Sequence, residues 1–178
     1  MTTVALAREL GTTDRTLRRL ADTGTLKVSR RAGRHRVVRP GEEAYLRSHW
    51  TLLNDLRVAL RTEPAVRMAV LFGSVALGDD HPGSDLDLLV DLGDAATLRQ
   101  RWGLRRRLSQ KTGREIDLFV LDDLRPQPEI LSPILDAARP IIDRHAGWPE
   151  LLAQRGSLKR RAERWHRRQR RILAQGLG

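Results

Sequence analysis

Residues 66–90, VRMAVLFGSVALGDDHPGSDLDLLV, decide the fold of this chain. The apolar run over residues 66–72 is typical of a buried strand, and Gly73-Ser74 ends it at the start of a short helix. A turn-rich loop follows, and residues 84–90 then alternate acidic and apolar side chains, as a half-buried strand does. The segment therefore predicts two strands that are joined by a glycine-containing turn, a short helix and a loop.

Carboxylates recur along the strands of this region. Asp85 and Asp87 are two residues apart, so the period of a strand places both on one face. Two such carboxylates repel each other unless a cation lies between them, and their oxygen atoms suit Mg²⁺ or Mn²⁺. Residues 114–120 form a further predicted strand, after a helix over residues 95–111, and Asp117 joins the pair if that strand lies beside the second one. The sequence therefore predicts three carboxylates that converge around divalent metal.

Nucleotide phosphates would complete such a site. Three carboxylates with two metal ions activate an attacking hydroxyl and neutralise a leaving pyrophosphate. Gly73 allows the backbone to approach a phosphate closely, and Ser74 offers an N–H and a hydroxyl at the start of the short helix. The alternative interpretation is that Asp85 and Asp87 are exposed acids on an edge strand and that Gly73-Ser74 is only a turn.

Gly73-Ser74, ten residues and then Asp85-x-Asp87 resemble the signature of the polymerase-β-like nucleotidyltransferases. The likeness is greatest to the minimal nucleotidyltransferase (MNT) type, whose pattern is GSxARGxxxxxSDxDLxV where this chain reads GSVALGDDHPGSDLDLLV. The family often has arginine where this chain has Leu77, and the missing cation would weaken binding of a triphosphate or a partner without removing metal ligands.

The resemblance extends over residues 66–143, because residues 130–142 resemble the helix and the last strand that close the family's domain. It implies an enzyme with these catalytic and metal-binding residues: Asp85, Asp87 and Asp117. It implies these nucleotide-binding residues: Gly73, Ser74 and Ser84. It also implies Mg²⁺ or Mn²⁺ as the cofactor and ATP as a substrate.

The function that the resemblance implies is transfer of a nucleoside monophosphate, by family habit AMP from ATP, to a hydroxyl, with release of pyrophosphate. The MNT type often occurs as the antitoxin of a toxin–antitoxin pair and adenylylates a toxin of the HEPN type. Three alternatives stay open: a toxin that modifies tRNA, an enzyme that modifies a small molecule, and a non-catalytic transcription regulator that senses nucleotide.

The first forty residues predict a DNA-binding module. Residues 3–10 have helical spacing, Gly11 breaks the run, and Thr12 or Thr13 can cap a second helix that continues to Thr23. Two short strands then flank a basic turn. This order predicts a winged helix-turn-helix over residues 1–40, and residues 17–26 also resemble the start of MerR-type winged domains. The predicted DNA contacts are Thr13, Arg15, Arg18, Arg19 and, at the tip of the wing, Arg34.

One such module binds DNA weakly, so the sequence predicts a homodimer on an operator with two half-sites. The alternative for this region is a small helical cap with a solvated basic face.

The rest of the chain falls into three predicted parts, and the fold class is α+β. Residues 41–63 form a linker helix, residues 64–145 a nucleotidyltransferase domain with a mixed β-sheet flanked by helices, and residues 146–178 a basic C-terminal helix. The last helix either packs on the transferase or a partner subunit, or clamps RNA or an acidic protein.

Composition and charge agree with separate tasks along the chain. The 178 residues carry a net charge of +11, divided into +6 over residues 1–50, −3 over residues 51–150 and +8 over residues 151–178. Basic ends attract polyanions, whereas the acidic middle suits a metal. The absence of cysteine excludes disulfides, thiol nucleophiles and cysteine-ligated metals. No apolar run reaches the roughly 20 residues of a membrane span, and the first residues lack a secretory pattern. We therefore expect a cytoplasmic protein without a membrane partner.

Two further expectations concern single residues. Lys111 and Arg114 lie just before the third strand, and we expect their side chains to be solvated at the end of a helix. The alternative is that they face the triphosphate. The tryptophans are expected to be packing anchors: Trp50, Trp102, Trp148 and Trp165.

Overall fold

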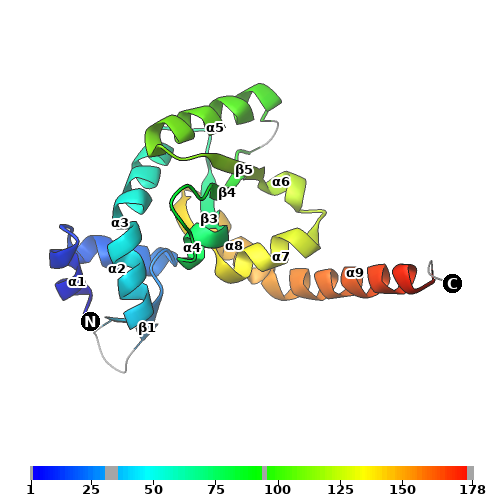
Figure 1. Cartoon of the computed structure of the whole chain (residues 1–178), viewed down its shortest axis with the longest axis horizontal. Coiled ribbons are helices and arrows are strands. Elements are labelled where there is room, and N and C mark those ends of the chain that lie inside the picture. Colours follow the sequence, from blue (N-terminus) through cyan, green and yellow to red (C-terminus); the bar gives the residue numbers. More distant parts are fainter. Residues whose placement is uncertain (1, 31–35, 94–95, 176–178) are drawn as a thin grey trace.

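The computed structural model describes residues 2–30, 36–93 and 96–175. A four-stranded sheet lies at the centre, small N-terminal elements lie on one side of it, and a long C-terminal helix projects on the other (Figure 1).

The N-terminal elements occur in the predicted order. Two short helices, α1 (Thr3–Glu9) and α2 (Asp14–Thr23), precede the antiparallel strands β1 (Val28–Arg30) and β2 (Arg36–Val38). The Thr13 hydroxyl caps α2 by accepting a hydrogen bond from the Thr16 N–H. The elements therefore agree with the sequence pattern, and their assignment as a winged helix-turn-helix stays a prediction.

Helix α3 (Pro40–Arg61) joins the two ends of one buried core. Its buried side chains lie in one cluster with side chains of α1 and α2 and with side chains of the central sheet. The apolar side chains that α3 buries are Tyr45, Leu46, Leu53, Leu56, Ala59 and Leu60. The predicted linker helix is therefore an integral core element.

The central sheet is mixed, as predicted. Its strands are β3 (Met68–Phe72), β4 (Leu86–Asp91), β5 (Ile116–Val120) and β6 (Arg139–Asp143). They lie in the order β5-β4-β3-β6, where β3 is antiparallel to both of its neighbours and β4 and β5 are parallel. The condition for convergence of the carboxylates was that the strand with Asp117 lies beside the strand with Asp87, and β5 does lie beside β4.

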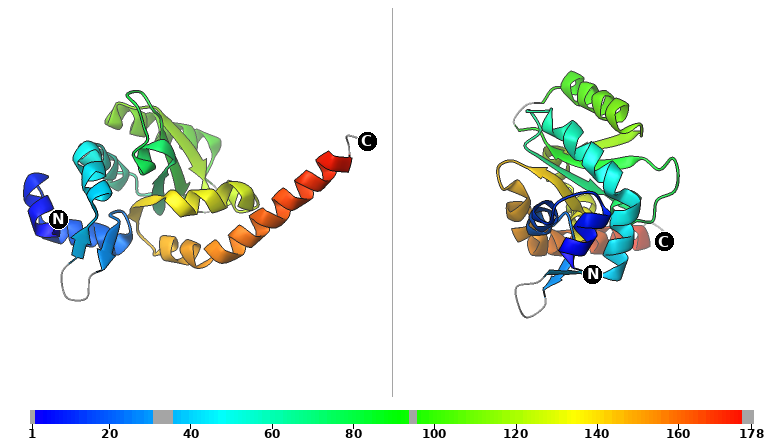
Figure 2. Two further views of the ribbon diagram at one scale, coloured as in Figure 1. Left: turned by 60° about the horizontal axis from the view of Figure 1, so that its bottom comes forward. Right: turned by 90° about the vertical axis from the view of Figure 1, so that its left-hand side faces the viewer.

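Helices cover both faces of the sheet (Figures 1 and 2). Helices α3 and α5 (Leu98–Thr112) pack on the face that includes Leu86, Leu88 and Val90. The other face includes Val70 and Leu89, whose side chains lie in one buried cluster with side chains of four helices, the last of which packs chiefly on the second. These are α6 (Leu121–Leu124), α7 (Pro128–Ala137), α8 (Gly147–Ala153) and α9 (Arg155–Gln175). The short helix α4 (Gly73–Leu77) follows directly from the end of β3.

The C-terminal region differs from the single helix that the sequence predicts. It consists of α8 and α9, which are separated at Gln154. The first half of α9 packs through Leu158 and Ala162, and its second half extends away from the body (Figure 2). None of the helices in the described ranges is long and apolar enough to cross a membrane.

The tryptophans do not all have the predicted role. Trp148 is a packing anchor, because only 6% of its surface is exposed. Trp102 on α5 and Trp165 on α9 are 64% and 40% exposed, so the expectation is wrong for both.

Candidate active site

The three predicted carboxylates lie at one end of the neighbouring strands β4 and β5. Asp87 is the second residue of β4, and its register partner in the parallel strand β5 is Asp117. Paired residues of neighbouring strands point to the same face, so both side chains share the face of Leu89. Asp85 precedes the first residue of β4 and is exposed. Strand pairing therefore brings together residues that are 30 positions apart in the chain.

Gly73 touches Asp87 directly. Gly73 has φ +71°, a conformation that favours glycine, and it follows Phe72, the register partner of Asp87. A Cβ atom at Gly73 would overlap Oδ2 of Asp87 and lie 2.9 Å from its Cγ. The glycine is therefore required by close packing against the carboxylate as well as by the turn.

We expect Gly73→Ala to reduce nucleotide transfer by about 100-fold, because the added methyl group displaces the Asp87 carboxylate by an ångström or more. Gly11→Ala is the matched control, since Gly11 has φ +62° but open space around an added Cβ. Both variants bear similar backbone strain, and only the first should lose activity in a labelled-nucleotide assay. Equal activities of the two variants would contradict a role for this contact.

The surroundings of Asp87 disfavour its negative charge, which a bound cation would stabilise. Burial, followed by the negative charges of Asp117 and Asp85, raises the pKa of Asp87 above its usual value. Asp117 is paired with Arg105, whose Nη2 lies 3.9 Å from its Oδ1. Within the described residues, Asp85 and Asp87 have no hydrogen-bonding or ion-pairing side chain as a partner.

This donor set fits a hard divalent cation. Carboxylate oxygens are the ligands that Mg²⁺ and Mn²⁺ prefer, and a cation would relieve the repulsion that raises the pKa of Asp87. The side chains are not gathered into a closed metal-binding group, and no set of three or more His, Asp or Glu with that geometry occurs in the part of the chain that the structure describes.

We predict that ionisation of Asp87 destabilises the metal-free protein as pH rises and that Mg²⁺ reverses this loss of stability. Its pKa in the folded state is above the unfolded value, so the free energy of unfolding of the metal-free protein should fall as pH rises from about 4 through the raised pKa. Asp87→Asn should therefore raise the melting temperature at neutral pH in EDTA. Mg²⁺ should raise that of the wild type and leave that of the variant unchanged. Thermal melts with and without MgCl₂ measure both effects.

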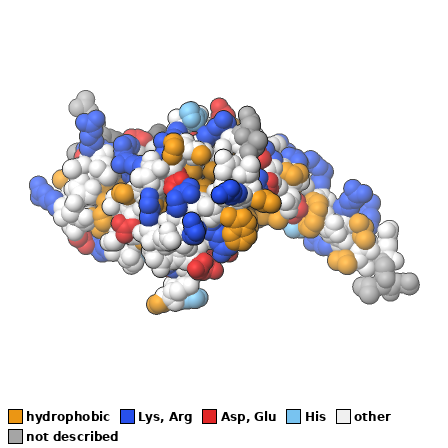
Figure 3. Space-filling view, turned by 90° about the horizontal axis from the view of Figure 1, so that it is seen from above, with side chains coloured by type: hydrophobic (Ala, Val, Ile, Leu, Met, Phe, Trp, Pro, Cys, Tyr) orange, Lys and Arg blue, Asp and Glu red, His pale blue; other side chains and the backbone are white. Residues whose placement is uncertain are grey.

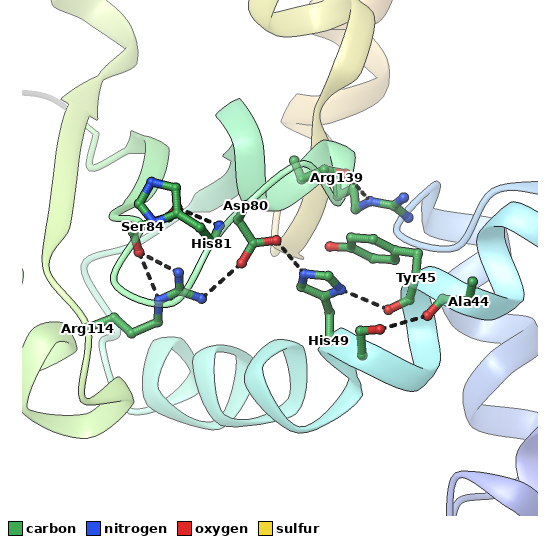
Figure 4. A network of polar contacts seen from close by, with 10 residues as sticks. Ala44, Tyr45, His49, Asp80, His81, Ser84, Arg114 and Arg139 are labelled. Carbon is green, nitrogen blue, oxygen red and sulfur yellow. Dashed lines mark hydrogen bonds and ion pairs between the residues drawn. The ribbon is translucent and has the colours of Figure 1, made fainter.

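A polar network fixes the loop that leads to Asp85 (Figure 4). Arg114 donates from Nε and Nη2 to the carbonyl of Ser84, at 2.9 and 2.5 Å, and its Nη1 lies 3.4 Å from Asp80. Asp80 in turn contacts Nε2 of His49 on α3 at 2.7 Å. Burial works against ionisation of Asp80, yet the bonds from His49 and Arg114 hold its pKa below the usual value. Arg114 is thus a half-buried anchor of this loop, and the expected solvated helix end is wrong for it.

The predicted nucleotide-binding residues occupy two places around this loop. Gly73 and Ser74 form the first turn of α4, where Ser74 is partly buried and its carbonyl accepts from the N–H groups of Gly78 and Asp79. The Ser84 hydroxyl accepts from the His81 N–H at 3.0 Å, so it closes the turn of the loop. Leu77, at the position of the family arginine, is 53% exposed.

The predicted DNA contacts lie on α2. Thr13 is its N-cap, and three arginines point outward from the helix. They are Arg15, Arg18 and Arg19. Arg18 lies 2.6 Å from Asp14 through its Nε. Arg34 is outside the described residues.

The sequence does not reveal the buried ion pair between Arg139 on β6 and Glu42 on α3. Its two bonds are 2.5 and 3.0 Å long, and the guanidinium also donates to the carbonyls of Thr25 and Ala76. The ring of Tyr45 stacks under it at 3.6 Å. Arg139 therefore ties the N-terminal elements to α4, which carries Gly73-Ser74. A lone arginine at the start of an apolar strand is the one signal that could have indicated it.

Comparisons with known proteins find a matching family model and related proteins. The family model described as polymerase beta, nucleotidyltransferase matches residues 54–146, about half of the chain. The curated protein named "Putative protein adenylyltransferase MJ0435", from Methanocaldococcus jannaschii, is 30% identical over 89 residues. The alignment covers 47% of this chain and 96% of that protein.

Solved structures share the fold. A chain of a toxin–antitoxin complex with AMP-PNP aligns with a TM-score of 0.56 at 19% identity, covering 71% of this chain and 98% of that chain. A second structure is a complex of the tri-AMPylated Shewanella oneidensis HEPN toxin with MNT antitoxin. One chain of this complex aligns with a TM-score of 0.53 at 18% identity, and the alignment covers 73% of this chain and 99% of that chain. With the family match over residues 54–146, the chain belongs to the polymerase beta nucleotidyltransferase family and is a nucleotidyltransferase.

Proposed function

We propose that this nucleotidyltransferase transfers AMP from ATP to a hydroxyl of a protein, with Mg²⁺ or Mn²⁺ bound by Asp85, Asp87 and Asp117. The observation that carries the proposal is the contact of the Asp87 carboxylate with the Gly73 backbone, with Asp117 as its register partner on the next strand. A phosphate chain at the start of α4 would then lie beside the carboxylates that hold its metal.

The reaction follows from these positions. When bound, the metal neutralises phosphate charge and lowers the pKa of the attacking hydroxyl. The acceptor oxygen attacks the α-phosphorus, the bond to the bridging oxygen of the β-phosphate breaks, and pyrophosphate leaves. Asp117, at the exposed edge of the site, takes the proton of the acceptor hydroxyl. The backbone at Gly73 and Ser74 holds the triphosphate in line.

We further propose that the acceptor is a toxin protein and that the chain is its antitoxin. Two relatives support this part: the fold is that of a chain in a complex of an AMPylated HEPN toxin with MNT antitoxin, and the sequence matches a protein named as an adenylyltransferase. In this reading the N-terminal elements bind operator DNA as a homodimer. The exposed arginines of α2 and the net charge of +6 over residues 1–50 favour it.

The decisive experiment is a transfer assay with α-labelled ATP, GTP, CTP and UTP, Mg²⁺ and a panel of acceptors. The panel contains the protein encoded beside this chain, total tRNA and buffer alone. Label from ATP on the protein supports the proposal, whereas label on tRNA supports an RNA-modifying toxin. No transfer with any nucleotide would leave a nucleotide-sensing regulator. Salt-sensitive binding to the chain's own promoter DNA tests the operator part separately.

A further inference from the structure

Helix α5 presents two large apolar side chains to solvent beside the candidate active site. Leu98 is 71% exposed and Trp102 is 64% exposed, and their spacing of four residues places them on one face of the helix. Exposed apolar patches often mark sites of interaction, and tryptophan is among the residues that contribute most to binding at interfaces. The exposed pair on α5 is therefore a candidate docking surface.

A groove connects these side chains with Asp117. It has a volume of about 360 Å³, and its walls come from α5 and from β5. The lining side chains that matter are Leu98, Trp102, Arg105, Asp117 and Phe119. Trp102 and Arg105 also border a larger hollow on the opposite side of α5, with a volume of about 1140 Å³. Trp102 therefore forms a ridge between two hollows, one of which reaches the carboxylate that faces the acceptor.

The charge of this surface selects an acidic occupant. Helix α5 carries six basic side chains and no acidic one, and Figure 3, which looks onto the molecule from above, shows basic side chains beside apolar ones. The six are Arg99, Arg101, Arg105, Arg106, Arg107 and Lys111. Arg99 and Arg106 line the larger hollow and have no ion-pairing partner within the described residues, so their charges remain for a ligand that extends past Trp102 into that hollow.

Strand β5 adds an edge that suits a peptide. It is the outermost strand of the sheet, and among the described strands it pairs with β4 alone. An extended segment can lie along such an edge and use its main-chain groups.

We propose that this surface, the α5 shelf (Leu98, Trp102, Arg105 and the edge of β5), docks an acidic, extended segment of the protein acceptor and directs its hydroxyl side chain toward Asp117. The inference rests on the proposed function and deepens it, because it assigns the class of acceptor. A nucleic acid fits less well, because it has no peptide groups to pair with the open edge of β5.

The test measures binding of short labelled peptides to the full chain by fluorescence anisotropy, with α,β-methylene ATP and Mg²⁺ present. One peptide has a tyrosine between glutamates and the other has a tyrosine between lysines. The acidic peptide should bind about tenfold more tightly than the basic one, and Trp102→Ala or Leu98→Ala should weaken it by about tenfold. Trp165→Ala is the matched control, because Trp165 is also exposed but lies on α9.

Affinity for α,β-methylene ATP should be unchanged in all three variants, which separates the α5 shelf from the nucleotide site. Equal binding of both peptides, or an unchanged affinity in the Trp102 and Leu98 variants, overturns the inference. A single-stranded RNA oligomer that binds in a Trp102-dependent manner overturns it in favour of a nucleic acid. Trp102-dependent binding of the acidic peptide without AMP transfer to any acceptor would sink the proposed function and leave the docking surface standing.

Discussion

The Asp85→Asn/Asp87→Asn double variant is expected to lose nucleotide transfer by on the order of 10³-fold or more, while its fold remains intact. Both substitutions keep the shape of the side chain and remove the charge that holds the metal. Asp87 is half-buried beside other carboxylates, so its replacement relieves repulsion in the metal-free protein. The variant should therefore melt at the wild-type temperature or above it. Label incorporation and thermal unfolding, measured on the same preparation, test both statements.

Asp55→Asn is the control for this experiment, because Asp55 is an exposed acid on α3 and belongs to neither of the strands that carry the candidate site. It should retain full activity. If the double variant transferred nucleotide at the control rate, the assignment of the carboxylates would be wrong. If it lost activity only because it unfolded, its melting curve would reveal that.

The largest effect on stability is expected from Arg139→Met. Arg139 and Glu42 are 3% and 7% exposed, and the substitution leaves a buried carboxylate without its partner. Breaking a buried pair in this way costs about 3–5 kcal/mol. For a chain of this size, that corresponds to a decrease of roughly 10 °C in the melting temperature. The carbonyls of Thr25 and Ala76 also lose their donor, which adds to the loss.

Arg47→Met provides the comparison. Arg47 also pairs with a glutamate, Glu9, but both side chains are 44% exposed. Exposed pairs contribute little to stability because water screens their charges, so this variant should remain close to the wild type. Urea titrations of the two variants give the difference directly. Similar losses in both would mean that the buried pair does not hold the N-terminal elements to the sheet.

The sequence predicted the elements around the candidate site because each one depends on local pattern. The apolar run before Gly73 and the alternation around Asp87 are strand signals, and the structure meets the stated condition that the strand of Asp117 lies beside that of Asp87. The family comparisons agree with that interpretation. The DNA contacts and the roles of the site residues remain predictions.

Tertiary contacts account for what the sequence did not reveal. Arg114 looked like a solvated cation because nothing local shows that its guanidinium reaches back 30 residues to Ser84. Glu42 and Arg139 are 97 residues apart, and only the packing of α3 against β6 brings them together. The exposure of Trp102 was missed for the opposite reason: composition favours burial of tryptophan, and only the fold shows which face of α5 lacks a neighbour.

The continuous core along α3 has a consequence for regulation. Side chains of α1 and α2 and side chains of the sheet belong to one buried cluster, so the N-terminal elements are packed against the rest of the protein. If the proposed homodimer binds two operator half-sites, the two candidate active sites would be held at a fixed distance from each other and in a fixed relative orientation. Binding to the operator would then determine which oligomers of the protein acceptor are large enough to contact both active sites at the same time.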